Sequence, residues 1–409
     1  MKSTMGVITG HPVLNANSRQ MALALSEAGI LDEFHTTLDT TVLARLFPHG
    51  RVGRSIGRRK LPGSVHRRTR THPVPEVIRL IRRSIPALTN TQKFAPDTVL
   101  HAIDWHMSRA IHQQTRAVYA YEDGALASFS RAREMGITRL YDLPIGYWRS
   151  AEKLLMEEVQ QVPEWASTIS MSTVADHAER MERKDAEISL ASAIVVASQF
   201  TARTLETFPG EIPPVRVIPY GGPPVAPERT DFTNRILRVL YVGSLTQRKG
   251  LSYLFDAVSE FDQHVELTVV GRKVAPNKAV DLALAKRNVT WVPTVDHSSL
   301  LNLMRSHDLL AFPSLFEGFG LVLPEALSQG LPVLATSHTG APDIITDGLE
   351  GWVVPVRSAD AIRARIELLL EHPALRRDMS HAATITARSL SWAAYRERLS
   401  AWVSEALVE

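Results

Sequence analysis

The chain has 409 residues, of which 44% are hydrophobic and 22% charged, a balance typical of a globular protein with roughly two to three domains. It contains no cysteine, which excludes disulfides, thiolate metal sites and a catalytic thiol, and it has no apolar run of about 18 residues that would predict a membrane-spanning helix. The first residues lead directly into a strand, not a signal peptide, so we expect a cytoplasmic protein.

The first predicted strand covers residues 7–9, and apolar residues with helical spacing predict a helix over 18–28. In a doubly wound parallel sheet, ligands bind beyond the carboxyl ends of the strands. His11 and Asn15 follow the first strand, so we predict that they face a cleft. An equally good alternative is that His11 has a structural role in its loop.

Positive charge is concentrated in residues 45–83, which hold twelve Lys or Arg against one acid, Glu76, although the whole chain carries only +3. Residues 77–83 have the pattern of a basic amphipathic helix. Such an element can lie on an anionic membrane surface or collect phosphate-bearing acceptors, and a solvated surface is the main alternative. Nucleic acid is not expected as a partner because no aromatic residues interleave with the charges.

Three further strands are predicted in the first half, at 117–120, 140–144 and 194–198. A helix over 101–114, whose histidines we interpret as structural, precedes the first of them, and a long charged helical region over 149–190 precedes the third. Acids and a tyrosine follow the first of these strands, and aromatic residues follow the second. Aromatic rings at such a position stack on sugar faces or line an apolar acceptor channel, and core packing is an equal alternative for Trp148. The candidate acceptor-side residues here are Tyr121, Glu122, Asp123, Tyr147 and Trp148.

The second half follows a Pro-rich linker at 223–233 and alternates strands and helices with short connections, which predicts a parallel sheet. Asp296 and His297 are expected to cap one of its helices. A last amphipathic helix is predicted over 392–408. The expected strands cover residues 239–243, 265–271, 289–293, 309–314, 332–336 and 352–355.

A basic loop follows the first strand of this half, in residues 243–250, which read GSLTQRKG. Arg248 and Lys249 are adjacent there, with glycines on either side. Arg offers a planar fork and Lys a point charge, so together they can bind a diphosphate. The alternative is a pair of exposed surface cations.

Two glutamates lie close together in residues 309–336, which read LLAFPSLFEGFGLVLPEALSQGLPVLAT. Glu317 stands in a glycine-rich loop and Glu325 about one turn into the following helix. The glycines allow positive φ and a close approach to the main chain, and a helix N-terminus suits a phosphate. Because a carboxylate can accept from adjacent hydroxyls, the pattern suits a ligand with a central diphosphate and a sugar at each end. The alternative is two solvated surface carboxylates.

The stretch Glu317-Gly-Phe-Gly-Leu-Val-Leu-Pro-Glu325, followed by Ala-Leu-x-x-Gly-Leu-Pro-Val, resembles the E-x7-E signature of bacterial-type family 4 retaining glycosyltransferases. The resemblance implies an α/β fold of the GT-B type, with two Rossmann-like domains whose parallel sheets face each other across a cleft. It also implies an acceptor-side domain over 1–225, a donor domain over 226–390 and a terminal helix over 391–409 that crosses back to the first domain.

The resemblance assigns catalytic roles to Glu317, Arg248 and Lys249, with the two cations stabilising the leaving diphosphate. Ser244 stands where the family often has arginine, and Arg248 is placed to take over that role. Tyr121 stands where a histidine is common, and Tyr220 replaces an asparagine. The donor-binding residues implied by the resemblance are Gly243, Ser244, Arg272, Pro293, Gly318, Phe319, Gly320, Leu321 and Glu325.

The expected reaction is retaining transfer of a sugar, which the resemblance implies to be a hexose, from a nucleoside-diphosphate-sugar to a hydroxyl acceptor. We expect a carbohydrate or lipid-linked acceptor, such as a cell-surface glycan precursor, and peripheral contact of residues 45–83 with the inner membrane face. No cofactor is expected. No metal is expected either, because the sequence lacks an Asp-x-Asp motif and the cationic side chains can take the place of a metal ion. The rival hypotheses are a GT-B phosphorylase or nucleotide-sugar epimerase and a non-catalytic scaffold of the same fold.

Overall fold

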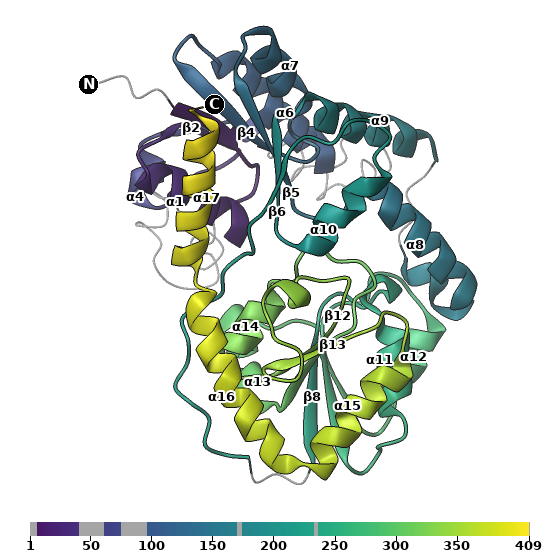
Figure 1. Cartoon of the computed structure of the whole chain (residues 1–409). Helices are drawn as coiled ribbons and strands as arrows, with labels where there is room; N and C mark the ends of the chain where they lie inside the picture. The colour runs from purple at the N-terminus through teal and green to yellow at the C-terminus, as the bar shows by residue number, and fades with distance from the viewer. Residues whose placement is uncertain (1–5, 41–60, 75–95, 170–173, 233–235, 409) are drawn as a thin grey trace.

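Short apolar runs form the strands of two separate parallel sheets in the computed structural model, which describes residues 6–40, 61–74, 96–169, 174–232 and 236–408. The central strands of both sheets are buried on both faces, as in a parallel sheet that is covered by helices on each side, whereas the edge strands are partly exposed. Each sheet with its helices forms one α/β domain, and Figure 1 shows one domain above the other.

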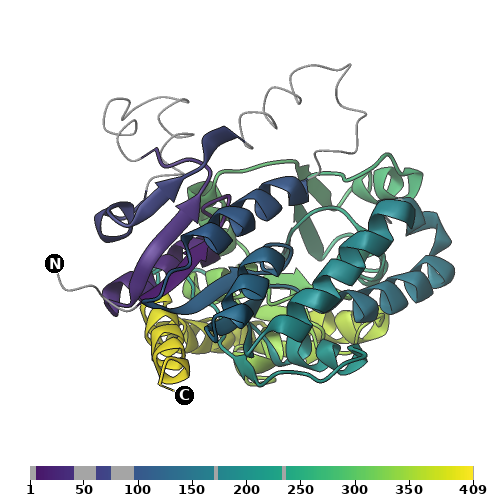
Figure 2. The same cartoon turned by 90° about the horizontal axis from the view of Figure 1, so that it is seen from above.

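Within the described residues, the N-terminal sheet has seven strands in the order β3-β2-β1-β4-β5-β6-β7. The strand order reverses between β1 and β4, so the loops after these two strands lie side by side at the switch point where such folds bind ligands. Figure 2 looks down on this domain. The strands are β1 (Gly6–Gly10), β2 (Leu31–Thr36), β3 (Thr69–Thr71), β4 (Thr115–Tyr121), β5 (Thr138–Leu143), β6 (Ala193–Val196) and β7 (Val215–Val217).

The C-terminal sheet has six strands among the residues described, in the order β10-β9-β8-β11-β12-β13. Here the switch point lies between β8 and β11, and it brings together the basic loop after β8 and the glutamate-bearing loop after β11. The strands are β8 (Leu237–Val242), β9 (Val265–Val270), β10 (Val289–Val292), β11 (Leu309–Phe312), β12 (Val333–Thr336) and β13 (Gly351–Val354).

Helices cover the faces of both sheets. In the first half of the chain they are α1 (Ala16–Glu27), α4 (Gly63–His66), α6 (Pro96–Ala110), α7 (Leu126–Glu134), α8 (Trp148–Gln161), α9 (Val174–Leu190) and α10 (Gln199–Thr204), with the 3-10 helices η3 (Pro163–Thr168) and η4 (Leu205–Thr207). In the second half they are α11 (Leu251–Val258), α12 (Lys278–Leu284), α13 (His297–Ser306), α14 (Val322–Ser328), α15 (Ala359–Glu371), α16 (Pro373–Ser389) and α17 (Trp392–Ala406), with η5 (Gln247–Lys249) and η6 (Ala341–Asp343).

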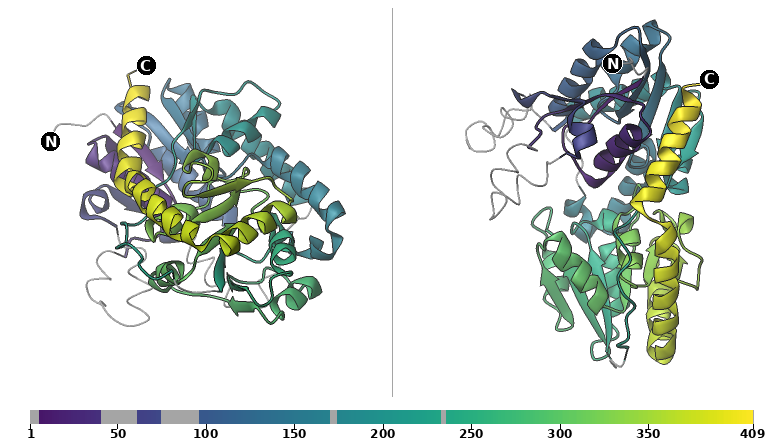
Figure 3. Two further views of the ribbon diagram at one scale, coloured as in Figure 1. Left: turned by 60° about the horizontal axis from the view of Figure 1, so that its bottom comes forward. Right: turned by 90° about the vertical axis from the view of Figure 1, so that its left-hand side faces the viewer.

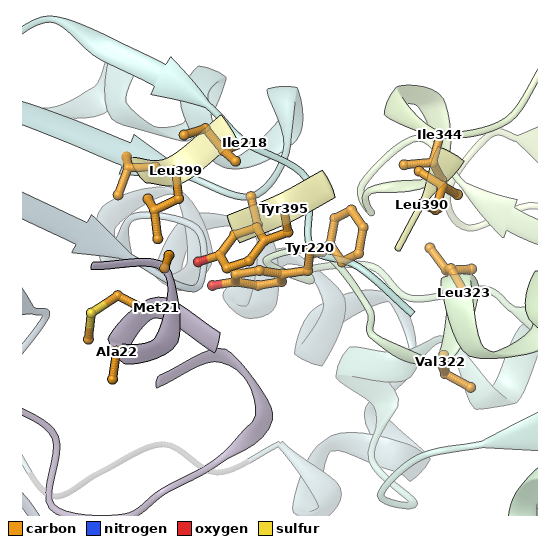
Figure 4. Close-up of a cluster of buried hydrophobic side chains, with 14 of the residues drawn as sticks. Met21, Ala22, Ile218, Tyr220, Val322, Leu323, Ile344, Leu390, Tyr395 and Leu399 are labelled. Atoms are coloured by element: carbon orange, nitrogen blue, oxygen red, sulfur yellow. The ribbon is translucent and has the colours of Figure 1, made fainter. Parts of the chain in front are cut away.

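The C-terminal helix α17 lies against α1 of the first domain, as Figures 1 and 3 show. Arg396 of α17 donates to Glu27 of α1 at 2.7 Å. A shared hydrophobic cluster continues from this contact into the C-terminal domain (Figure 4). Its labelled members come from α1, α14, α17 and the loops between the domains: Met21, Ala22, Ile218, Tyr220, Val322, Leu323, Ile344, Leu390, Tyr395 and Leu399.

Some predicted elements differ from the observed ones. The charged region 149–190, expected to be a long helical region, is divided into α8, η3 and α9, because Val162 leaves the helical conformation and Pro163 begins a new turn. Most of the basic segment, at 45–60 and 75–83, lies outside the described residues. Across the parts of the chain that are described, no helix combines the length and apolar character needed to cross a membrane.

Candidate functional site

Glycines allow the loops at the carboxyl ends of the C-terminal strands to pack main chain against main chain. A Cβ at Gly271 would lie 1.7 Å from the carbonyl oxygen of Gly243. Gly250 has a φ of +67°, and a Cβ there would lie 2.0 Å from the carbonyl oxygen of Pro313. The loops after β8, β9 and β11 are therefore fixed relative to one another, which fixes the side chains that they carry.

The three predicted catalytic side chains meet at this edge of the sheet. Lys249 is 8% exposed, and its Nζ contacts Oε2 of Glu317 and lies 4.9 Å from the ring centroid of Phe312. Arg248 donates from Nη1 to the carbonyl of Phe316 at 2.6 Å, and this nitrogen is 3.5 Å from Glu317 Oε2. Burial lowers the pKa of Lys249, and Glu317 counteracts the shift. Two cations thus face one carboxylate, which leaves an excess of positive charge.

The N-terminal domain holds the loop that carries Glu317. Ser198 Oγ and Thr201 Oγ1 donate to the carbonyl of Gly318, at 2.5 and 2.9 Å. A Cβ at Gly318 would lie 1.9 Å from the carbonyl oxygen of Pro144 in the loop after β5. The position of this loop therefore depends on contacts between the two domains.

The rest of the loop offers main chain, not side chains, to a ligand. Gly320 has a φ of +93°, and a Cβ there would lie 2.6 Å from the ring of Phe312. The ring of Phe319 is buried against Gly340. Of this residue, which we predicted to bind the donor, only the backbone can therefore contact a ligand. Leu321 directly precedes α14 and packs against the shared hydrophobic cluster.

Glu325 lies on α14, where His297 Nε2 contacts its Oε1 at 2.9 Å. Burial raises the pKa of Glu325, and His297 opposes the shift. Asp296 caps α13 as predicted, accepting from the Ser299 N–H at 3.0 Å, but His297 faces Glu325 instead of the cap. Sequence reasoning missed this pairing because 28 residues separate the two side chains. With only two turns, α14 has a weak dipole, so Arg248 and Lys249 are the main positive charges here.

The other predicted donor-side residues line the carboxyl edge of β8, β9 and β10. The carbonyl of Ser244 accepts from the Tyr241 hydroxyl at 2.9 Å. Arg272 Nε donates to Thr294 Oγ1 at 3.0 Å, directly after Pro293. The second contact links the loops after β9 and β10, and the roles of Ser244, Arg272 and Pro293 toward a donor stay predictions.

On the facing domain, His11 and Asn15 follow β1 but carry structural contacts. The Asn15 side chain accepts from the Ser18 N–H at 2.8 Å and caps α1. His11 packs edge-on against Tyr121, with ring centroids 5.0 Å apart, and its Nδ1 accepts from the Val13 N–H at 3.1 Å. Burial lowers the pKa of His11 to about 4, so its imidazole is neutral at pH 7. Tyr121 is itself buried.

The two acids after β4 are paired inside the domain, which contradicts the prediction that they face a cleft ligand. Lys184 of α9 contacts Glu122 at 2.8 Å and Asp123 at 3.4 Å, and both carboxylates are almost fully buried. The carboxylate of Glu187 accepts from the backbone N–H groups of Asp123 and Ala125 at 2.9 and 3.0 Å. The ion pairs of Glu122 and Asp123 with Lys184, together with the hydrogen bonds to Glu187, thus fasten the loop after β4 to α9.

The prediction that Tyr147 lines a cleft is wrong because its side chain is wholly buried. Its hydroxyl donates to Asp185 Oδ1 at 2.5 Å, and the Trp148 indole N–H donates to the same oxygen at 2.8 Å. Arg149 lies over the Trp148 ring at 4.2 Å and also contacts Asp185. Both aromatic residues therefore hold the start of α8 against α9.

The sequence of the C-terminal half is similar to a known protein family. Residues 228–386 match the family described as glycosyl transferases group 1. D-inositol 3-phosphate glycosyltransferase of Corynebacterium glutamicum is 31% identical over 182 residues, which cover 41% of this chain and 43% of that protein. The chain spans less than half the length of the curated relatives it matches.

Similarity of structure extends over the whole chain. Sucrose-phosphate synthase from Thermosynechococcus elongatus superposes with a TM-score of 0.67 at 19% identity, covering 98% of both chains. Anabaena HepE in complex with UDP-glucose gives a TM-score of 0.63 at 15% identity, covering 98% of this chain and 99% of that one. The predicted GT-B fold, with two Rossmann-like domains, is confirmed.

Proposed function

We propose that the chain is a family 4 retaining glycosyltransferase that transfers a hexosyl group from a nucleoside-diphosphate-sugar to a hydroxyl acceptor. The observation that carries the proposal is the meeting of Arg248, Lys249 and Glu317 at the switch point of the C-terminal sheet. Its location in the segment that matches group 1 glycosyl transferases supports it further.

The chemistry follows from the charges. When the sugar leaves, negative charge develops on the departing nucleoside diphosphate, and preorganised cations lower the energy of that transition state. Arg248 and Lys249 supply two positive charges, so the transfer needs neither a divalent metal nor a cofactor. Glu317, beside Lys249, accepts from hydroxyls of the sugar. Glu325, on the following helix, accepts from the ribose hydroxyls.

The acceptor binds on the N-terminal side, where His11 and its loop lie at the switch point of the first sheet. We assign a carbohydrate or lipid-linked acceptor because residues 45–83 carry twelve cations against one acid. Such a segment attracts phosphate groups or an anionic lipid surface. This assignment places the enzyme in the cytoplasm, in peripheral contact with the inner face of the membrane.

The test is nucleotide release from UDP-, GDP- and ADP-sugars, with and without EDTA, in the presence of membrane-derived and soluble acceptors. We expect release with one donor that EDTA does not abolish, and a product with the anomeric configuration of the donor. Conversion of the donor sugar without transfer would identify an epimerase. Nucleotide binding without any turnover across the panel would favour a scaffold.

A further inference from the structure

The helix α8 has its two ends fixed in different domains. At its start, the Tyr147 N–H donates to Thr204 Oγ1 at 2.8 Å, and Arg149 contacts Asp185, so this end belongs to the N-terminal domain. At its other end, Glu158 is wholly buried among residues of the C-terminal domain. Figure 1 shows α8 reaching from the upper domain down beside the lower one.

Both oxygens of the Glu158 carboxylate have partners in the C-terminal domain. Oε1 accepts from Gln247 Nε2 at 2.7 Å and from the Tyr253 hydroxyl at 3.0 Å. Oε2 accepts from Arg357 Nε at 2.8 Å. Burying a carboxylate costs free energy unless hydrogen bonds or an ion pair compensate for the lost solvation. The contacts of Glu158 supply both, so they form a specific polar interaction between the two domains.

Arg357 reaches this carboxylate from a strained backbone. Its φ is +61°, a conformation that residues other than glycine adopt at a cost. The guanidinium also donates to the carbonyl of Leu154 on α8 at 2.9 Å. The hydrogen bonds from the Arg357 side chain to α8 therefore outweigh the cost of its backbone conformation.

Gln247 is the first residue of η5, the short turn that carries Arg248 and Lys249. Its backbone N–H donates to Thr168 Oγ1 at 2.8 Å, and its Nε2 donates also to Ser252 Oγ at 2.6 Å. The turn ends at Gly250, whose backbone lies against the next loop. Gln247 fixes one end of the turn and Gly250 the other. The orientation of the Arg248 and Lys249 side chains therefore depends on how Gln247 is held.

We propose that Glu158 is a positioning residue, which aims Arg248 and Lys249 at the diphosphate by holding Gln247, so that α8 couples the placement of the N-terminal domain to the donor site. The inference rests on the proposed function, because it needs a diphosphate to bind between these cations. Glu158 itself touches neither reactant.

The chain offers a matched control in Glu157, the preceding residue of α8. Its side chain is 46% exposed and contacts the same Arg357, at 3.2 Å, but it makes no contact with Gln247. We therefore compare Glu158→Gln with Glu157→Gln by calorimetry, using UDP, GDP and ADP and the nucleoside that corresponds to each.

Glu158→Gln should weaken binding of the preferred nucleoside diphosphate about tenfold, because the hydrogen bond from Gln247 loses its charge assistance and Arg357 loses its counter-ion. Binding of the nucleoside should stay unchanged, because only the phosphates meet the two cations. Glu157→Gln should resemble the wild-type protein in both measurements. Equal losses for diphosphate and nucleoside, or wild-type affinity in a folded Glu158→Gln variant, would overturn the proposal.

A second variant keeps the test decisive if Glu158→Gln does not fold. Gln247→Met breaks the same link from the other side and should weaken diphosphate binding alone. Where all variants fold, the double variant should lose no more than the stronger single one, since both act through one bond, whereas additive losses would contradict the mechanism. If Lys249→Ala leaves diphosphate binding intact, the donor site itself is wrong; if only Glu158→Gln is silent, the positioning role alone fails.

Discussion

Replacing Glu317 with glutamine should separate donor binding from sugar transfer. In the structure Glu317 is the counter-ion of Lys249 and lies 3.5 Å from Arg248, and its side chain is 17% exposed. A diphosphate must share the same two cations, so the carboxylate competes with it. Glutamine keeps the shape of the side chain and removes the negative charge.

The expected effects have opposite signs. A hydrogen bond to a charged group contributes about 1.5–3 kcal/mol, and part of this free energy is recovered by the diphosphate when its competitor is neutral. We therefore expect Glu317→Gln to bind the nucleoside diphosphate as tightly as wild type or up to about tenfold more tightly. Transfer should fall by about a hundredfold or more, because the variant lacks the carboxylate that we propose holds the sugar hydroxyls.

The assay pairs calorimetry of the nucleoside diphosphate with nucleotide release under saturating donor. Circular dichroism of the variant checks that the loop substitution has not unfolded the protein. A folded Glu317→Gln protein that binds diphosphate tenfold more weakly would refute the competition between the carboxylate and the ligand. Wild-type transfer by this variant would refute the role of Glu317 in catalysis.

The other predictions concern binding and stability. Lys249→Ala and Glu325→Ala should each weaken nucleoside diphosphate binding by about tenfold or more in calorimetry while the unfolding temperature stays near wild type. Gly318→Ala should lower the free energy of unfolding by about 2 kcal/mol or more, and the unfolding temperature by several degrees, because the new Cβ would lie 1.9 Å from the Pro144 carbonyl oxygen. For His11, the folded pKa of about 4 lies below the ordinary 6.5, so burial of the neutral ring costs stability as pH falls from 6.5 towards 4. His11→Gln should remove about 2 kcal/mol of the loss in unfolding free energy between pH 7 and pH 4.5, measured by urea unfolding at both pH values.

Two comparisons make the stability predictions specific. Gly63→Ala introduces the same methyl group where no atom lies within 4 Å, so its unfolding temperature should match wild type. An equal fall for Gly63→Ala and Gly318→Ala would show that the contact between the domains is not responsible. For His11→Gln, a pH dependence identical to wild type would show that another group causes the loss of stability in acid.

Local patterns were sufficient to predict the six strands of the C-terminal sheet and the meeting of Arg248, Lys249 and Glu317, whereas β2 and β3 of the first sheet were missed. The loops that carry them follow two strands of one parallel sheet, and the switch point of a doubly wound sheet brings such loops together. The same rule placed His11 and Tyr121 side by side in the first sheet. Where the fold itself creates the neighbourhood, strand order in the sequence is enough.

The rule does not say what a side chain contacts after its loop has been placed. Tyr147 follows a strand as a ligand-binding residue would, yet its partner is Asp185, and Glu122 pairs with Lys184 of the same helix. Both partners lie in α9, which the sequence shows only as part of a charged helical region. Nothing in the local pattern distinguishes a helix that covers such a loop from one that leaves it open to a ligand.

The proposed donor site depends on a similar contact between distant parts of the chain. Glu158 and Gln247 are 89 residues apart and lie in segments that the sequence assigns to different domains. Trp165 of η3 also packs against Phe255 in the C-terminal core, with ring centroids 6.0 Å apart. A fully buried carboxylate and a buried indole fasten α8 and η3 to the second domain, so this part of the first half packs as a part of that domain. The cations of the donor loop are thus tied to a helix whose other end is fixed beside Asp185, and any rotation of one domain against the other must strain or break one of those two attachments.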